Sequence, residues 1–143
     1  MKRTISLFPV VLVSFIVFSG CFMGAIYAVK YVKDMDKVIL TMQTEGNARE
    51  IYDASVHANK TEYPYAEISE ENRDKMIYEG KMAMKRGGEL WFRWQMKQTS
   101  EGMTKVEVQL KGEGMEDKAM EEYAVRSIQA FCDEIGKRCE IKR

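Results

Sequence analysis

Residues 90–96 read Leu90-Trp91-Phe92-Arg93-Trp94-Gln95-Met96. Apolar side chains occupy every second position of this stretch, and Trp91, Arg93 and Gln95 lie between them. Such strict alternation is typical of a β-strand with one buried face and one solvated face. We therefore expect a strand here, with Trp94 on its buried face and Trp91 on its outer face.

The neighbouring segments repeat this pattern. Apolar residues alternate over 76–84 and again over 106–110. Lys85-Arg86-Gly87-Gly88 and Ser100-Glu101-Gly102 separate the three segments and supply turn chemistry. Three consecutive alternating strands joined by short turns predict an antiparallel meander with one face in the core.

The remaining segments predict what covers that face. Residues 37–43 read as a further strand, and a capping box from Asn47 to Glu50 opens a helix to about Asn59. A short strand is expected over 63–68, irregular because Pro64 cannot donate a hydrogen bond. A second helix over 116–135 ends before Gly136. We expect an α+β domain over 37–143: an antiparallel sheet of about four to five strands with two helices packed on one face, in the order β-α-β-β-β-β-α, after an N-terminal apolar leader.

The leader begins with Lys2 and Arg3, and no charged residue follows until Lys30. Within it, Ser19-Gly20-Cys21 resembles the lipobox of bacterial lipoproteins. That resemblance implies a signal peptide over 1–20, a lipid on Cys21 and a membrane-proximal linker over 21–36. An uncleaved single-pass anchor over 4–29 is the alternative, since about 20 apolar residues span a bilayer. In either case the basic start places the domain outside the cytoplasm, on the periplasmic side of a bacterial cell envelope.

A wider resemblance covers most of residues 20–135. The stretches Tyr31-Val32-Lys33, Ile51-Tyr52-Asp53-Ala54 and Thr104-Lys105-Val106-Glu107-Val108 look like a group of small bacterial lipoproteins of unassigned role. Gly112-Glu113-Gly114-Met115 departs from that pattern, because a glycine-aspartate pair is expected there. The resemblance implies a fold and a location, and it implies no chemistry.

The two cysteines after the leader, Cys132 and Cys139, leave two interpretations open. An exported compartment permits a disulfide between them. Along a continuous helix they would lie roughly 10 Å apart, which is too far for a bridge. A helix that ends at Gly136 would let the chain fold back and bring the sulfurs together. Otherwise both are unpaired thiols.

The sequence offers no catalytic constellation. His57 is the only histidine and falls on the polar face of its helix, away from any nucleophile. Adjacent carboxylates such as Glu121 and Glu122 point about 100° apart on a helix and do not share a site. We therefore expect no catalytic residue, no metal site, no cofactor and no enzymatic activity.

The chain carries 22 basic and 22 acidic residues, which gives no long-range attraction to nucleic acid. We expect a membrane-tethered, non-enzymatic module that binds an envelope protein or a second copy of itself, and the outer residues Trp91, Arg93 and Lys97 form a candidate interaction surface. The alternative is a carrier of an apolar or lipid ligand in a groove between the helices and the sheet, which the many core-facing methionines would suit.

Overall fold

The computed structural model describes residues 26–143, and the proposed signal peptide and Cys21 lie outside this range. Within this range seven strands and two helices follow one another: β1 (Ile26–Asp34), β2 (Lys37–Glu45), α2 (Ala48–Glu62), β3 (Glu67–Asn72), β4 (Ile77–Ala83), β5 (Glu89–Ser100), β6 (Met103–Glu113), α3 (Asp117–Glu134) and β7 (Arg138–Lys142).

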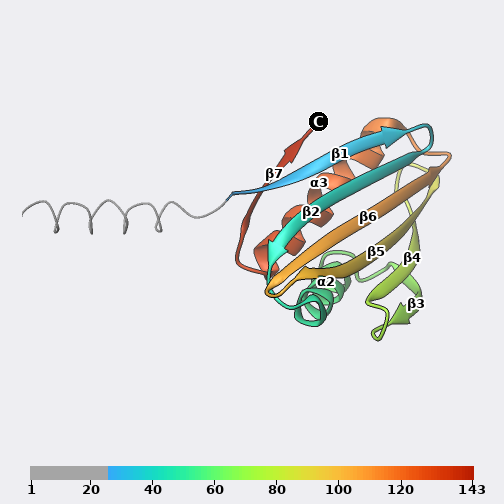
Figure 1. Ribbon diagram of the computed structural model, residues 1–143. Helices are drawn as coiled ribbons and strands as arrows, with labels where there is room; N and C mark the ends of the chain where they lie inside the picture. Colours follow the sequence, from blue (N-terminus) through green and yellow to red (C-terminus); the bar gives the residue numbers. More distant parts are fainter. Residues whose placement is uncertain (1–25) are drawn as a thin grey trace, which may run out of the picture.

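The strands form one sheet in the order β3-β4-β5-β6-β2-β1-β7. All neighbours are antiparallel except β1 and β7, which run parallel. Both helices cover the same face of the sheet, with α2 against β5 and β6 and α3 against β6 and β7 (Figure 1). The α+β class is confirmed, as is the placement of the helices. The expected size of the sheet is wrong, because it has seven strands and is mixed.

The alternating stretch at the centre of β5 behaves as its pattern predicts. Leu90, Phe92, Trp94 and Met96 are almost completely buried, and Trp91 and Arg93 lie on the other face. Trp94 pairs with Tyr78 of β4 and with Val108 of β6 in the register of the sheet. Side chains paired in this way stand on the same face, so the three strands present one continuous apolar surface to the helices.

The two strands missed by the sequence interpretation lie beside each other at one end of the sheet. β1 occupies residues 26–34, which the sequence suggested as part of an apolar run and a linker. Its inward residues, Val29 and Tyr31, pack against the core. The apolar leader runs without interruption into β1, so periodicity could not separate the two. β7 is only five residues long and depends on its pairing with β1.

The strand expected over 63–68 is displaced along the chain. Residues 63–66 form the end of α2 and a turn, in which the Tyr63 N–H donates to the Asn59 carbonyl at 2.8 Å and the Ala66 N–H donates to the Tyr63 carbonyl at 3.0 Å. Pro64 sits within this turn, where its missing N–H costs nothing. β3 begins only at Glu67.

Both helices begin and end close to the expected residues. The Asn47 side chain accepts from the Arg49 N–H at the start of α2, as a helix cap does. Gly136 adopts a left-handed φ of 67° just after α3 and turns the chain into β7. Neither helix in residues 26–143 combines the length and the apolar character that crossing a bilayer requires.

Candidate ligand site

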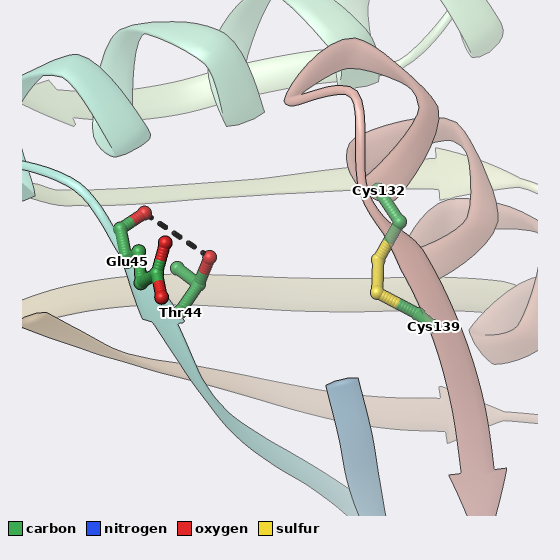
Figure 2. Close-up of a disulfide and its surroundings, with 4 residues drawn as sticks. All are labelled: Thr44, Glu45, Cys132 and Cys139. Carbon is green, nitrogen blue, oxygen red and sulfur yellow. Dashed lines mark hydrogen bonds between the residues drawn. A yellow bond between two sulfur atoms is a disulfide. The ribbon is translucent and has the colours of Figure 1, made fainter. Parts of the chain in front are cut away.

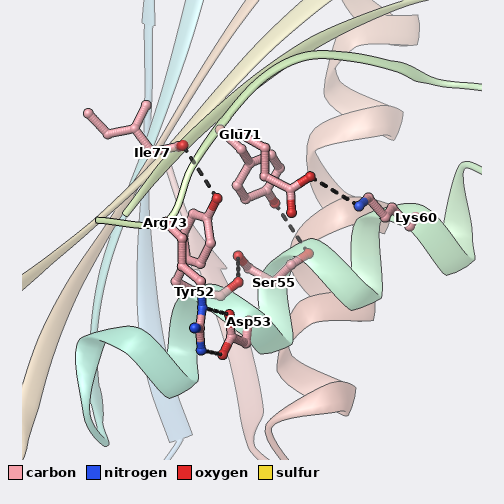
Figure 3. Close-up of polar contacts among 8 residues, drawn as sticks. Tyr52, Asp53, Ser55, Lys60, Glu71, Arg73 and Ile77 are labelled. Carbon is pink, nitrogen blue, oxygen red and sulfur yellow. Dashed lines mark hydrogen bonds and ion pairs between the residues drawn. The ribbon is translucent and has the colours of Figure 1, made fainter. Parts of the chain in front are cut away.

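Helix α2 is fastened to the outer strands β3 and β4 by polar contacts along its length (Figure 3). The Tyr52 hydroxyl donates to the Ile77 carbonyl at 3.5 Å, and the Tyr78 hydroxyl donates to the Ser55 carbonyl at 3.2 Å. Two surface ion pairs, Arg73 with Asp53 and Lys60 with Glu71, continue the connection. These contacts fix the last turn of α2, and with it Asn59, over the sheet.

Asn59 belongs to a cluster of buried polar atoms that make no hydrogen bond of normal geometry within residues 26–143, although its amide lies near enough to the Tyr123 and Tyr78 hydroxyls to oppose the rise in their pKa. The cluster contains both side-chain polar atoms of Asn59 and the hydroxyls of Tyr63 and Tyr123; Trp94 Nε1 and the Tyr27 hydroxyl, elsewhere in the fold, also lack a partner among the described residues. Asn59 is 5% exposed and Tyr123 is 3% exposed. More than nine in ten buried polar groups in native proteins are paired. A group of orphaned atoms in one region is therefore a candidate for binding something from outside the chain.

Aromatic rings surround these atoms. The Tyr63 and Tyr123 rings lie 4.8 Å apart between centroids, and the Tyr123 ring stacks with Phe92 at 6.4 Å. On the far side, Trp94 stacks with Tyr78 at 5.9 Å and meets Phe131 edge-on at 5.6 Å. The walls of the cluster thus come from both helices and from β4 and β5, and the sequence separates them by up to about seventy residues.

A surface cleft of about 360 Å³ reaches this cluster from the side. Asn59, Lys60, Tyr63, Pro64, Ala66 and Ile68 line it. Its volume lies within the range of small-molecule sites, and its lining is mostly apolar with a few polar atoms, as such sites are. Tyr63 belongs to the cleft on one side and to the aromatic cluster on the other. It therefore stands between solvent and the orphaned atoms.

The hydroxyls of the cluster remain protonated at neutral pH. Burial raises the pKa of Tyr63 to about 12, although Arg126 opposes part of that rise with its guanidinium 5.8 Å from the ring. Burial also raises the pKa of Tyr123, and the neighbouring Asn59 amide opposes it. Each hydroxyl can thus both donate and accept, and the Asn59 amide adds a donor and an acceptor. Together they suit the polar edge of a neutral ligand.

Two of the residues proposed from sequence are joined by the structure. Cys132 and Cys139 form a disulfide with their Cα atoms 6.1 Å apart (Figure 2). The bridge ties the end of α3 to β7, and the chain reverses at Gly136 between them. It lies beside an open cleft of about 660 Å³, whose lining includes Lys137 and Arg138. Cys21, proposed as the lipid attachment point, is outside the described residues.

The proposed interaction surface lies on the open face of the sheet. Trp91 is half-buried in a shallow cleft of about 440 Å³ that it shares with Lys37 and Lys111. Arg93 is engaged by Glu79, whose Oε1 lies 3.3 Å from its Nε. Lys97 is exposed and stands opposite Lys105. The structure places the three residues on one face, and their role as an interface stays a prediction.

Other residues considered from sequence do not join the site. His57 is largely exposed on α2 and its Nδ1 lies 2.9 Å from Glu134. No group of His, Cys, Asp and Glu within the described part of the chain has the arrangement of a metal site. Most of the core-facing methionines, such as Met42 and Met96, are fully buried and fill the interior beneath the helices.

The sequence interpretation missed the residues that make the candidate site. Asn59 follows Ser55 by four positions and so shares the buried face of α2. Tyr123 follows Met120 by three positions on α3 and shares its buried face in the same way. That spacing could have placed both side chains in the core. It gave no sign that they would meet there without partners.

No family model matches the sequence, and no curated protein matches it. Several solved structures resemble the fold. BexL, a di-domain ARO/CYC from the BE-7585A biosynthetic pathway, matches with a TM-score of 0.54 and 10% identity over 71% of this chain and 47% of its own. The chain thus spans about half the length of BexL.

Two further solved structures resemble the same fold. CalU16 from Micromonospora echinospora matches with a TM-score of 0.54 and 10% identity, over 77% of this chain and 82% of its own. StfQ, a di-domain ARO/CYC from the steffimycin biosynthetic pathway, matches with a TM-score of 0.50 and 13% identity, over 68% and 43% respectively.

These likenesses correct one expectation from sequence. We expected a domain without enzymatic activity because no triad, metal site or carboxylate pair was visible. That inference is wrong, because BexL and StfQ are aromatase/cyclases with the same fold. A sheet with helices on one face is a scaffold on which catalysis occurs, and identities near 10% carry the fold alone. What this chain shares with all three proteins is the fold.

Proposed function

We propose that the domain binds a small, planar, largely apolar molecule that carries one or two hydrogen-bonding atoms, and that it does so beneath α2 and α3. The observation that supports this is the group of polar atoms without hydrogen bonds within residues 26–143 on Asn59, Tyr63 and Tyr123, beside an open cleft that Asn59 and Tyr63 line. A buried donor or acceptor without a partner costs about 1–3 kcal/mol. A ligand that supplies the missing partners removes that cost.

The shape of the proposed ligand follows from the aromatic side chains at the cleft. The Tyr63 ring lines the cleft and lies 4.8 Å from the Tyr123 ring behind it, which stacks in turn on Phe92. A planar molecule can extend such a stack, because offset aromatic contacts are favourable beyond the area they bury. The cleft of about 360 Å³ accommodates a molecule of two or three fused rings and excludes a whole phospholipid.

Tyr63 controls access in this proposal. It is the residue that ends α2, and it is followed by Pro64 in a turn that only one helix hydrogen bond and one turn hydrogen bond hold. Turning the Tyr63 side chain outward toward the exposed Tyr65 joins the cleft to Asn59 and Tyr123. The rest of the core, anchored by β4, β5 and α3, keeps its packing.

The test uses 2-naphthol, a planar fluorescent probe with one hydroxyl. We expect the protein to bind it, and Asn59→Leu to weaken binding at least tenfold, which corresponds to about 1.4 kcal/mol. The same substitution removes an orphaned amide, so the free energy of unfolding should stay equal or rise. Fluorescence titration measures the first effect and chemical unfolding the second.

His57→Leu is the matched control, because His57 lies on the same helix but on its exposed face. It should leave naphthol binding unchanged. Naphthalene, which lacks the hydroxyl, should bind the wild type more weakly than 2-naphthol does. If Asn59→Leu destabilises the fold and leaves the affinity for 2-naphthol intact, the polar cluster is structural and the proposal fails.

We further propose that the domain is held at the outer surface of a bacterial membrane by acyl chains on Cys21. The lipobox-like Ser19-Gly20-Cys21 after an uncharged run supports this. An uncleaved helix is the alternative anchor. Since β1 begins at Ile26, such a helix has only residues 4–25 available to it, which is still about the length that a bilayer requires.

Cys21→Ser is expected to abolish incorporation of labelled palmitate and to leave an unprocessed precursor of higher mass. Both changes follow from the loss of the thiol that carries the lipid. Gel autoradiography and intact-mass measurement of the membrane fraction report them. Absence of label from the wild-type protein, with the protein still in the membrane fraction, would instead identify the uncleaved helix as the anchor.

A further inference from the structure

Exposed apolar side chains are concentrated at one edge of the sheet. Four large apolar residues among 26–143 are exposed: Ile26 (53%), Val32 (39%), Met35 (91%) and Tyr65 (59%). Three of them belong to β1 or to the turn that follows it. Single exposed apolar residues need no explanation, but a group on one strand marks a contact surface.

The register of the sheet places basic residues among them. Ile26 pairs with Arg138 of β7, Lys30 pairs with Lys142 of β7, and Val32 pairs with Ile39 of β2. Paired residues share a face, so these side chains stand together on the face that the helices leave open. We call Ile26, Lys30, Val32, Arg138 and Lys142 the β1–β7 surface. Glu140, opposite Ala28, is the acidic residue between them.

None of the three basic residues of this surface is held in an ion pair within the described part of the chain. Around α2 and α3 three cations are held in ion pairs, Arg73 by Asp53, Lys60 by Glu71 and Arg126 by Glu62, whereas Arg49 and Lys118 are not paired within residues 26–143. Lys30, Arg138 and Lys142 form no ion pair with any residue of the described range. Their charges are therefore available to an anion outside the chain.

The position of the proposed anchor decides which anion the basic side chains of the β1–β7 surface can reach. Cys21 precedes Ile26 by five residues, which span at most about 18 Å when fully extended. Ile26 is the first residue of β1, so an acylated Cys21 holds this end of the sheet next to the lipid headgroups. The tether is too short for the domain to move far from the membrane.

We propose that the β1–β7 surface lies on the anionic bilayer to which the chain is anchored. This inference rests on the proposed anchoring. Ile26 and Val32 enter the boundary between headgroups and acyl chains, while Lys30, Arg138 and Lys142 reach lipid phosphates. Apolar and basic side chains alternate on this surface as they do on interfacial membrane segments. In this orientation α2, α3 and the Asn59 cleft face away from the membrane.

The test places the full chain, purified from a bacterial membrane, in vesicles of phosphatidylglycerol and phosphatidylethanolamine that contain a phospholipid with a photoactivatable headgroup. After illumination, mass spectrometry locates the cross-linked residues. We expect cross-links in residues 26–34 and 138–143. Lys30→Glu with Lys142→Glu should reduce their yield at least fivefold, and so should replacement of phosphatidylglycerol by phosphatidylcholine.

Lys97→Glu with Lys105→Glu makes the same charge change on the same sheet face, on β5 and β6, which lie four and three strands away from β7, and should leave the yield unchanged. Equal loss in both double variants, or cross-links chiefly on α2 and α3, overturns the inference. Cross-links confined to residues 21–25 also overturn it but support the anchoring. If the protein carries no cross-link and separates from the vesicles, the anchoring itself fails.

Discussion

Replacing Trp94 by alanine is expected to lower the free energy of unfolding by about 3–5 kcal/mol. Trp94 is 1% exposed and is the largest fully buried side chain between residues 26 and 143. Its indole stacks on Tyr78 and meets Phe131 of α3 edge-on. The truncation therefore removes one of the aromatic contacts between the sheet and α3 and leaves a cavity. Urea unfolding followed by circular dichroism measures the loss.

Trp91→Ala is the matched control, because Trp91 lies three residues away on the same strand with its side chain on the open face. It should cost well under half as much. Trp94→Phe should fall between the two, since it keeps a ring and removes the unpartnered Nε1. Equal losses for Trp91→Ala and Trp94→Ala would contradict the assignment of the two faces of β5.

Reducing the bridge between Cys132 and Cys139 is expected to lower the free energy of unfolding by about 2.5 kcal/mol. The bridge closes a loop of only eight residues, and the chain-entropy relation gives that value for so short a loop. It also ties β7, an edge strand of five residues that pairs with β1, to the end of α3. Denaturant unfolding with and without dithiothreitol measures the difference.

Cys132→Ala with Cys139→Ala supplies the control for this experiment. The double variant should unfold at about the same denaturant concentration as the reduced wild type and should no longer respond to dithiothreitol. A small additional loss is expected, because Cys132 is 2% exposed and alanine fills less of its site. Identical unfolding of oxidised and reduced wild type would show that β7 needs no covalent support.

The central part of the fold could be predicted because local pattern and tertiary packing agree there. The alternation around Trp94, the cap at Asn47 and the glycine at 136 each specify one local structure, and the structure contains all three. The two edge strands could not be predicted in the same way. β1 is preceded by an apolar leader that hides where it begins, and β7 is too short to show a period of its own.

The candidate site could not be predicted from the sequence, for a different reason. Tyr123 and Asn59 occupy core-facing helical positions, where an aromatic ring or a polar residue near a helix end has an ordinary structural explanation. What makes them unusual is their lack of partners, which depends on how α2 crosses α3 and the sheet. That packing brings together residues about sixty positions apart, and no local pattern encodes it.

The pairing of β1 with β7 has a consequence for how the chain is made. Synthesis proceeds from the N-terminus, so β1 is the first strand of this sheet to emerge and its partner β7 emerges more than a hundred residues later. Until β7 emerges, β1 presents a row of unpaired backbone groups, and a bare strand edge invites pairing with another molecule. A nascent chain that stalls before Arg138 is thus an aggregation hazard even though its core residues are all present. Pairing with β7 covers this edge of β1, and any sequence that follows β7 must leave the strand free to pair.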